Sequence, residues 1–234
     1  MCRSRLTRGL ILASLLATLF GLPGNVQAAF VGNPTPEATR FAFSHSIDFT
    51  VSQRALSSTR WTSPVTMESV RLLARESYGL VGWRGFLINV SGMFGVTRNG
   101  IDFGTVFLPP EFWDRYAPDT PHSAGRRSLF FGEASGVSAG AGLKVRLFEW
   151  KGMGMGGAVQ LLYTEAKDVG QPSLRLRYNE WDTFFGMSFK RKFMGIYAGA
   201  TASWLVGEMS TPDPFIATDL DQDTLVGAAA GFTM

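Results

Sequence analysis

The stretch FAFSHSIDFTVSQR at residues 41–54 alternates bulky apolar residues with small or polar ones. Its odd positions include Phe43, Ile47 and Phe49, and its even positions are mostly serine and threonine together with Asp48. Successive side chains of an extended chain point to opposite faces, so this period of two predicts a β-strand. One face of that strand is apolar and the other is polar, and the fold depends on which of them lines the interior.

Similar alternation recurs in seven later segments, which predicts eight strands in all. These segments are 67–78, 86–96, 137–147, 155–164, 181–190, 196–206 and 226–234. Each has an apolar face of about 9–11 residues, the length that crosses a bilayer at a tilt. The pattern therefore favours strands whose apolar face contacts lipid and whose polar face lines the interior.

The expected connections alternate between long and short along the chain. The long ones are 55–64, 98–128, 166–172 and 207–222, and the short ones are 79–84, 150–152 and 191–193. Long loops at one end and tight turns at the other are typical of outer-membrane barrels, whereas a soluble sandwich has no reason to sort its loops in this way. We predict an all-β, antiparallel, up-and-down transmembrane β-barrel with eight strands, or at most ten. A soluble β-sandwich is the alternative.

Two segments depart from this simple pattern. Residues 101–108 also alternate, and we interpret them as a hairpin arm or strand extension within the second long loop, with a ninth strand as the alternative. Between Tyr178 and Trp181 the apolar residues change from even to odd positions. Either a bulge near Glu180 or a strand that continues beyond the membrane would explain this change.

The first 28 residues predict a secretory signal peptide. Three arginines precede an apolar run over residues 10–22, and the segment ends in Val26-Gln27-Ala28. We expect cleavage near Ala28, so that residues 29–234 form the barrel domain. Cleavage removes Cys2, the only cysteine, and three of the 22 basic residues but none of the 19 acidic ones. The remaining charges balance, which gives no support for nucleic-acid binding.

Charged residues follow the polar alternation. Arg or Lys facing lipid at the membrane midplane costs about 2–4 kcal/mol, so we expect these side chains to pair inside the barrel. The predicted lumen network is Asp48, Arg71, Arg75, Lys144, Arg146, Asp182 and Lys190. Four tryptophans are predicted to form aromatic belts, Trp181 and Trp204 near the loop end and Trp83 and Trp150 near the turn end.

The sequence offers little for catalysis or metal binding. Its two histidines are His45 and His122, and we predict no catalytic, cofactor-binding or metal-binding residues. His45 falls on the apolar face, which requires a bulge or a position near the rim, and its neighbouring serines fall on the other face. The acidic run at 219–223 has the spacing of three calcium ligands, but it lacks the glycine and the final glutamate of a calcium loop. We interpret it as an acidic extracellular loop.

The layout resembles the small eight-stranded outer-membrane proteins of the OmpA, OmpX and opacity-protein type. The stretch YNEWDTFFGMSFKRKFMGIYAGATASW at 178–204 resembles one hairpin of such barrels, and the start FVGNPTPEATRFAF at 30–43 is similar to the mature N-terminus of the chlamydial-type major outer membrane porin. Such proteins usually end in an aromatic residue, whereas this sequence ends in GFTM.

The resemblance implies an integral protein of the bacterial outer membrane, in contact with outer-membrane lipid and lipopolysaccharide and inserted by the barrel assembly machinery. It is expected to have a structural role, to bind an unidentified ligand at the surface through the long loops, or to allow limited solute passage. No catalysis and no cofactors are expected. The alternatives are a general porin with a diffusion pore and an outer-membrane lipid-modifying enzyme.

Overall fold

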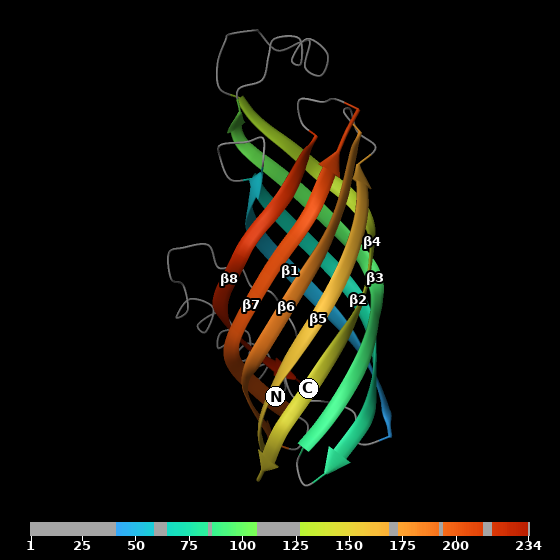
Figure 1. Ribbon diagram of the computed structural model, residues 1–234, viewed down its shortest axis with the longest axis vertical. Helices are drawn as coiled ribbons and strands as arrows, with labels where there is room; N and C mark the ends of the chain where they lie inside the picture. The colour runs from blue at the N-terminus through green and yellow to red at the C-terminus, as the bar shows by residue number, and fades with distance from the viewer. Residues whose placement is uncertain are drawn as a thin grey trace, which may run out of the picture.

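The protein folds into a closed ring of eight antiparallel strands, each hydrogen-bonded to its neighbours in the sequence (Figure 1). The computed structural model describes residues 41–58, 65–83, 86–106, 127–168, 173–191, 194–212 and 217–233. The strands are β1 (Phe43–Ser58), β2 (Val65–Trp83), β3 (Phe86–Val106), β4 (Arg127–Trp150), β5 (Met153–Asp168), β6 (Leu174–Arg191), β7 (Met194–Ser210) and β8 (Thr218–Thr233). The predicted eight-stranded, all-β, up-and-down barrel is confirmed. The described residues include no helix that is long and apolar enough to cross a membrane.

The strands run further toward the loop end than their apolar faces predict. Their lengths range from 16 to 24 residues, so they extend into all four segments that were expected to be long loops. Residues 101–106 continue β3 and pair with β4, through Asp102 opposite Phe130 and Val106 opposite Arg127. This part of the 101–108 stretch is therefore a strand extension and not a ninth strand, and residues 107–108 lie outside the described part of the chain.

The turn end is the end at which β2–β3, β4–β5 and β6–β7 are connected. Between β4 and β5, Trp150 pairs with Met153, and the two residues between them both have positive φ, 48° at Lys151 and 83° at Gly152. Positive φ at both central residues is the signature of a type I′ turn, whose twist matches that of the flanking strands. A Cβ at Gly152 would lie 2.4 Å from the carbonyl oxygen of Lys190, so glycine is needed here for both its conformation and its size.

The two faces of the barrel exchange polarity along its axis. Over most of the height, the outer face exposes apolar side chains such as Phe49, Leu72 and Phe94, which we call the outer band, and the inner face is polar. Toward the loop end the outer face carries charge, in a zone that we call the collar. The collar comprises Glu68, Arg98, Glu165, Lys167, Arg175, Arg177, Glu208, Asp219 and Asp221.

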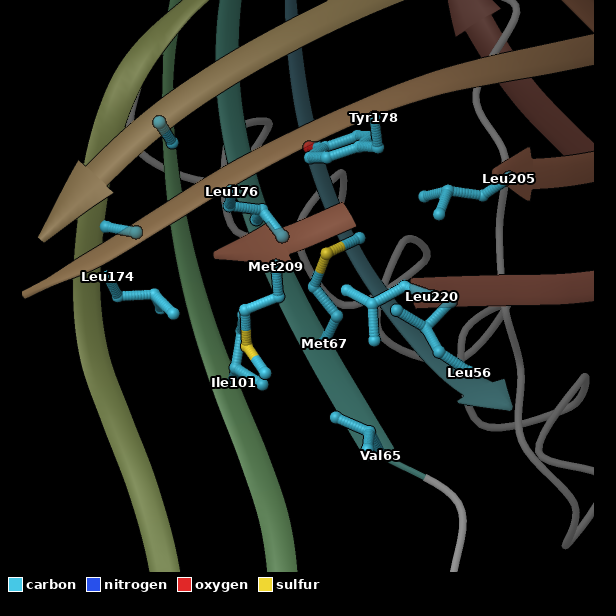
Figure 2. Packing of buried hydrophobic residues seen from close by; sticks show 12 residues of the cluster. Leu56, Val65, Met67, Ile101, Leu174, Leu176, Tyr178, Leu205, Met209 and Leu220 are labelled. Atoms are coloured by element: carbon cyan, nitrogen blue, oxygen red, sulfur yellow. The ribbon is translucent and has the colours of Figure 1, made fainter. Parts of the chain in front are cut away.

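Inside the collar the barrel is filled by an apolar layer, to which all eight strands contribute. Figure 2 shows its side chains converging within the barrel. The layer comprises Leu56, Val65, Met67, Ile101, Ala134, Ala166, Leu174, Leu176, Tyr178, Leu205, Met209 and Leu220. Each of these is at most 2 % exposed.

The exchange of polarity explains the change of apolar phase near Tyr178. The ladders that β6 forms with β5 and β7 run without a register shift from Leu174 to Phe189 and from Arg175 to Arg191. The bulge that would have explained the phase change is therefore absent from β6. Instead the strand continues past the outer band, and its apolar residues move from the outer face to the inner face.

The seam between the first and last strands is paired at the loop end. Ser57 lies opposite Asp221 and Ser58 opposite Leu220, and no other β1–β8 register pair is found among the described residues. The Ser57 hydroxyl donates a hydrogen bond to the Asp221 carbonyl oxygen at 2.9 Å. Just below, β8 has one extra residue relative to β7, because the ladder shifts register between Ser203 and Leu205.

Candidate functional site

The centre of the lumen is an ion-paired triad from three strands. Glu180 on β6 accepts from Arg54 on β1 through Oε1 and pairs with Arg71 on β2 through Oε2, at 2.5 Å from Arg71 Nη2. The three side chains are at most 4 % exposed. Two guanidinium groups therefore share one buried carboxylate, which ties β6 to β1 and β2 across the interior.

A second chain of contacts runs toward the turn end. Arg75 Nε donates to Asp48 Oδ2 at 2.7 Å, and Arg75 Nη2 donates to Gln160 Oε1 at 3.1 Å. The amide of Gln160 then donates to Asp182 Oδ2 at 3.0 Å, and Asp182 lies 3.6 Å from the guanidinium of Arg54. The charged network, defined as Asp48, Arg54, Arg71, Arg75, Gln160, Glu180 and Asp182, thus links four strands through charge-assisted hydrogen bonds.

Hydrogen bonds to neutral groups anchor the network in the wall. Arg54 Nη1 donates to Ser203 on β7 at 2.7 Å and to Gln222 on β8 at 2.9 Å, so Arg54 joins both sides of the seam. Arg71 Nη2 lies 3.0 Å from the Tyr178 hydroxyl, which donates to Asn99 Oδ1 at 3.1 Å. Tyr178 therefore connects the charged network with the apolar layer above it.

Below the network, aromatic residues fill the lumen. The rings of Phe184 and Tyr197 pack edge to face, with centroids 6.0 Å apart, and Ala158 completes this cluster. Glycine at position 186 leaves room for these rings. A Cβ at Gly186 would lie 2.6 Å from the Phe184 ring. Beside the charged network a cavity of about 10 Å³ opens, which is room for a single water molecule. The described part of the lumen is therefore packed in three successive layers.

The structure brings together four of the seven side chains predicted for the lumen. Asp48, Arg71, Arg75 and Asp182 belong to the charged network, and Lys144 is buried on the inner face of β4. The other two lie near the turn end. Arg146 is 22 % exposed and pairs with Glu149 at 2.5 Å, where the β4–β5 ladder shifts register, and Lys190 is exposed one residue before β6 ends. Arg146 keeps the inner phase at the last regular step of the ladder, opposite buried Leu87 and Gly156, and the membership of Arg146 and Lys190 in the lumen network stays a prediction.

Sequence reasoning missed the two most central members of the network, Arg54 and Glu180. The signal was present, because Arg54 shares the even positions of Asp48 and Glu180 shares those of Asp182. Arg54 stands at the end of the apolar alternation, next to an expected loop. Glu180 stands where the apolar phase changes, so its position on the inner face was not recognised.

The four tryptophans lie at the two ends of the outer band. Trp181 and Trp204 are register partners on β6 and β7, with stacked rings whose centroids are 5.8 Å apart, just below the collar. Trp83 and Trp150 are exposed at the turn end, and Lys151 Nζ lies 4.8 Å from the Trp150 ring centroid.

The collar is held by ion pairs on its outer face. Arg175 Nη2 contacts Glu165 Oε1 at 2.6 Å, and Arg177 lies 3.7 Å from Glu165 and 3.5 Å from Glu208. The hydrogen bond from Arg175 holds the pKa of Glu165 below its ordinary value. Asp219 and Asp221 also belong to this outer face of β8, so their interpretation as part of a loop was wrong.

His45 lies on the outer face near the rim, two residues after the start of β1. The β1–β2 ladder is regular from Phe43 to Leu56, so the rim and not a bulge explains its position. Its ring is 70 % exposed and lies 3.5 Å from the carboxylate of Glu76, which is 73 % exposed. The flanking serines are on the inner face, and the described residues contain no group of three side chains suited to a metal ion.

The predicted signal peptide and His122 lie outside the described residues.

Comparison with known proteins gives no relative. No protein-family model, no curated protein and no solved structure matches this chain.

Proposed function

We propose that this protein is an integral barrel of the bacterial outer membrane with a sealed lumen, and that its role is structural or is exerted through its surface. The observation that carries the proposal is the outer band and its polar limits. On β1 and β2 the band is bounded by Gln53 opposite Glu68 toward the loop end and by His45 opposite Glu76 toward the turn end.

The height of the band fits the proposal. The two polar limits are eight positions apart on each strand. At about 3.3 Å per residue and a tilt near 40°, this separation corresponds to a height of roughly 20 Å, close to the apolar band of about 25 Å in outer-membrane barrels. The stacked Trp181–Trp204 pair at one end and Trp150 at the other suit the two membrane–water interfaces.

Exposure of the band supports lipid as its surroundings. Ile47, Phe49 and Val51 on β1 are each more than 60 % exposed, and they continue without interruption into the outer face of β2. Soluble proteins rarely expose contiguous apolar patches larger than a few hundred Å². In lipid such a surface costs nothing, whereas the charges that would be costly there face inward.

Packing of the lumen favours a sealed barrel over the general porin. An eight-stranded ring is just wide enough to be filled by side chains. Here the aromatic cluster, the charged network and the apolar layer follow one another along the axis, so water would have to cross a zone lined by leucine, methionine and isoleucine. No observation favours the lipid-modifying enzyme, because His45 and its neighbouring serines lie on opposite faces.

Two measurements on one preparation test the proposal. Residues 29–234 are refolded in detergent, and the electrophoretic mobility is compared before and after boiling. We expect a heat-dependent mobility shift and, in a planar bilayer, no resolved conductance steps. Solubility without detergent and no shift would refute the membrane assignment, and stable conductance steps would replace the sealed barrel with the porin.

A further inference from the structure

The small cavity beside the charged network is enclosed by buried polar side chains. Its volume is about 10 Å³, and the residues that line it come from β1, β2, β5 and β6. Ser52, Arg54 and Asp182 are among these residues, and each of them is at most 6 % exposed. A molecule bound in this cavity would therefore be held inside the barrel and shielded from its surroundings.

Three polar atoms of the lining residues have no hydrogen-bond partner within the described part of the chain. They are Ser52 Oγ, Arg54 Nε and Asp182 Oδ1. Buried polar atoms are nearly always hydrogen-bonded, either to other protein groups or to ordered water. Three such atoms on residues that share one cavity therefore indicate that the cavity holds a hydrogen-bonding ligand.

The contact between Arg54 and Asp182 has the length expected when a molecule lies between two groups. Asp182 Oδ2 accepts from the amide of Gln160 at 3.0 Å, so this oxygen is satisfied. Asp182 Oδ1 lies 3.6 Å from Arg54 Nη2, which is too long for a direct hydrogen bond. At such a distance a bridging water is the usual explanation.

The charges around the cavity favour a neutral ligand over an ion. The charged network contains three arginines and three carboxylates, so it has no excess charge of either sign to attract an ion. Arg54 and Arg71 would repel a cation, and Asp182 would repel an anion. A neutral molecule that both donates and accepts can satisfy Asp182 Oδ1 and Arg54 Nε together, and the Ser52 hydroxyl can serve as donor or acceptor.

The volume of the cavity limits the ligand to the size of water. About 10–15 Å³ of this kind of volume holds one water molecule, and a buried water usually makes two to four hydrogen bonds. The three atoms without partners provide that number. An organic molecule with a similar set of donors and acceptors would be too large.

We infer that the cavity is a binding site for one ordered water molecule, which bridges Ser52 Oγ, Arg54 Nε and Asp182 Oδ1. This water is a member of the charged network. It connects Asp182 with Arg54 and adds Ser52, so that β1 and β6 are joined by hydrogen bonds as well as by charge. The inference concerns the interior of the barrel and does not depend on lipid around it.

A crystal structure of the full-length protein in detergent, at about 2 Å resolution or better, tests the inference. We expect one density peak in the cavity, at about 2.6–3.2 Å from each of the three atoms. Crystals soaked in rubidium chloride and in sodium bromide should show no anomalous peak there. An empty cavity, or direct contact between Arg54 and Asp182 Oδ1 that closes it, would overturn the inference. An anomalous peak would also overturn it, by assigning the site to a cation or an anion.

A pair of variants tests the role of Ser52 in the site. Ser52→Val replaces the hydroxyl by methyl groups that extend into the cavity, and we expect the density peak to be lost. Thr164→Val is the matched control, because its hydroxyl lies 2.8 Å from Ser138 Oγ and does not line the cavity, and it should keep the peak. A peak that persists in Ser52→Val would contradict the bridge. If Ser52→Val does not fold, the unchanged protein alone decides the inference.

Discussion

Replacing Glu180 by glutamine removes the charge that two buried arginines share. Glutamine keeps the shape and one carbonyl oxygen, so the change is mainly electrostatic. Among the described residues, Arg71 would keep the neutral Tyr178 hydroxyl as its hydrogen-bond partner, whereas Arg54 would keep Ser203, Gln222 and the more distant Asp182. Removing one partner of a buried ion pair costs about 3–5 kcal/mol. We expect the lower part of that range, because Asp182 partly compensates Arg54.

The assay is equilibrium unfolding of the refolded barrel by guanidinium chloride, followed by tryptophan fluorescence and by the heat-sensitive gel band. Glu208→Gln is the matched control, because Glu208 faces outward and lies 3.5 Å from Arg177 in an exposed pair. Exposed pairs contribute at most about 1 kcal/mol, so the control should unfold close to the unchanged protein. If Glu180→Gln were no less stable than Glu208→Gln, the charged network would not stabilise the barrel and the reasoning would fail.

Three further changes test the seam, the apolar layer and the turn. The extra residue in β8 predicts that Gln53 lies opposite Val226, below the paired end of the seam. On oxidation, a cysteine pair at 53 and 226 should therefore form a disulfide more completely than a cysteine pair at 51 and 226. Equal disulfide yields from the two pairs would exclude this register. Leu176→Asp buries an unpaired carboxylate in the apolar layer, so we expect the variant to lose the gel band that shifts on boiling. Normal folding of this variant would contradict a water-free apolar layer. Gly152→Ala forces a Cβ against a carbonyl oxygen at positive φ, and we expect about 1 kcal/mol or more of destabilisation by guanidinium titration.

The fold was predictable because alternation is a local property of the chain. Each apolar face of 9–11 residues identified one strand, and the order of long and short connections fixed the up-and-down arrangement. The strand ends were not predictable in the same way. The prediction ended each strand where its apolar face changed sides, and in β6 the pairing continues unbroken through that change.

The network was predictable by face but not by partner. Alternation placed Asp48 and Arg75 on one side of the wall, but contact between Arg54 and Glu180 depends on curvature that brings β1 opposite β6. The hollow on the outer face of β4 to β8 depends on side-chain volumes on five neighbouring strands, and register decides which of these side chains lie together. Residue volumes are visible in the sequence, whereas the register that aligns Gly157 with Phe185 and Ala200 is not.

The exchange of polarity means that two different forces stabilise the two parts of the barrel. In the collar, apolar side chains leave water on closure of the ring, so the hydrophobic effect favours the closed form there. If the outer band lies in a membrane, as we propose, lipid on the outside removes that driving force there, and hydrogen bonds and ion pairs in the lumen must hold the wall. The apolar layer draws side chains from all eight strands, so it forms only when β1 and β8 meet. The observed pairing of Ser57 with Asp221 lies at this level, which makes the collar the part of the structure that closes the barrel.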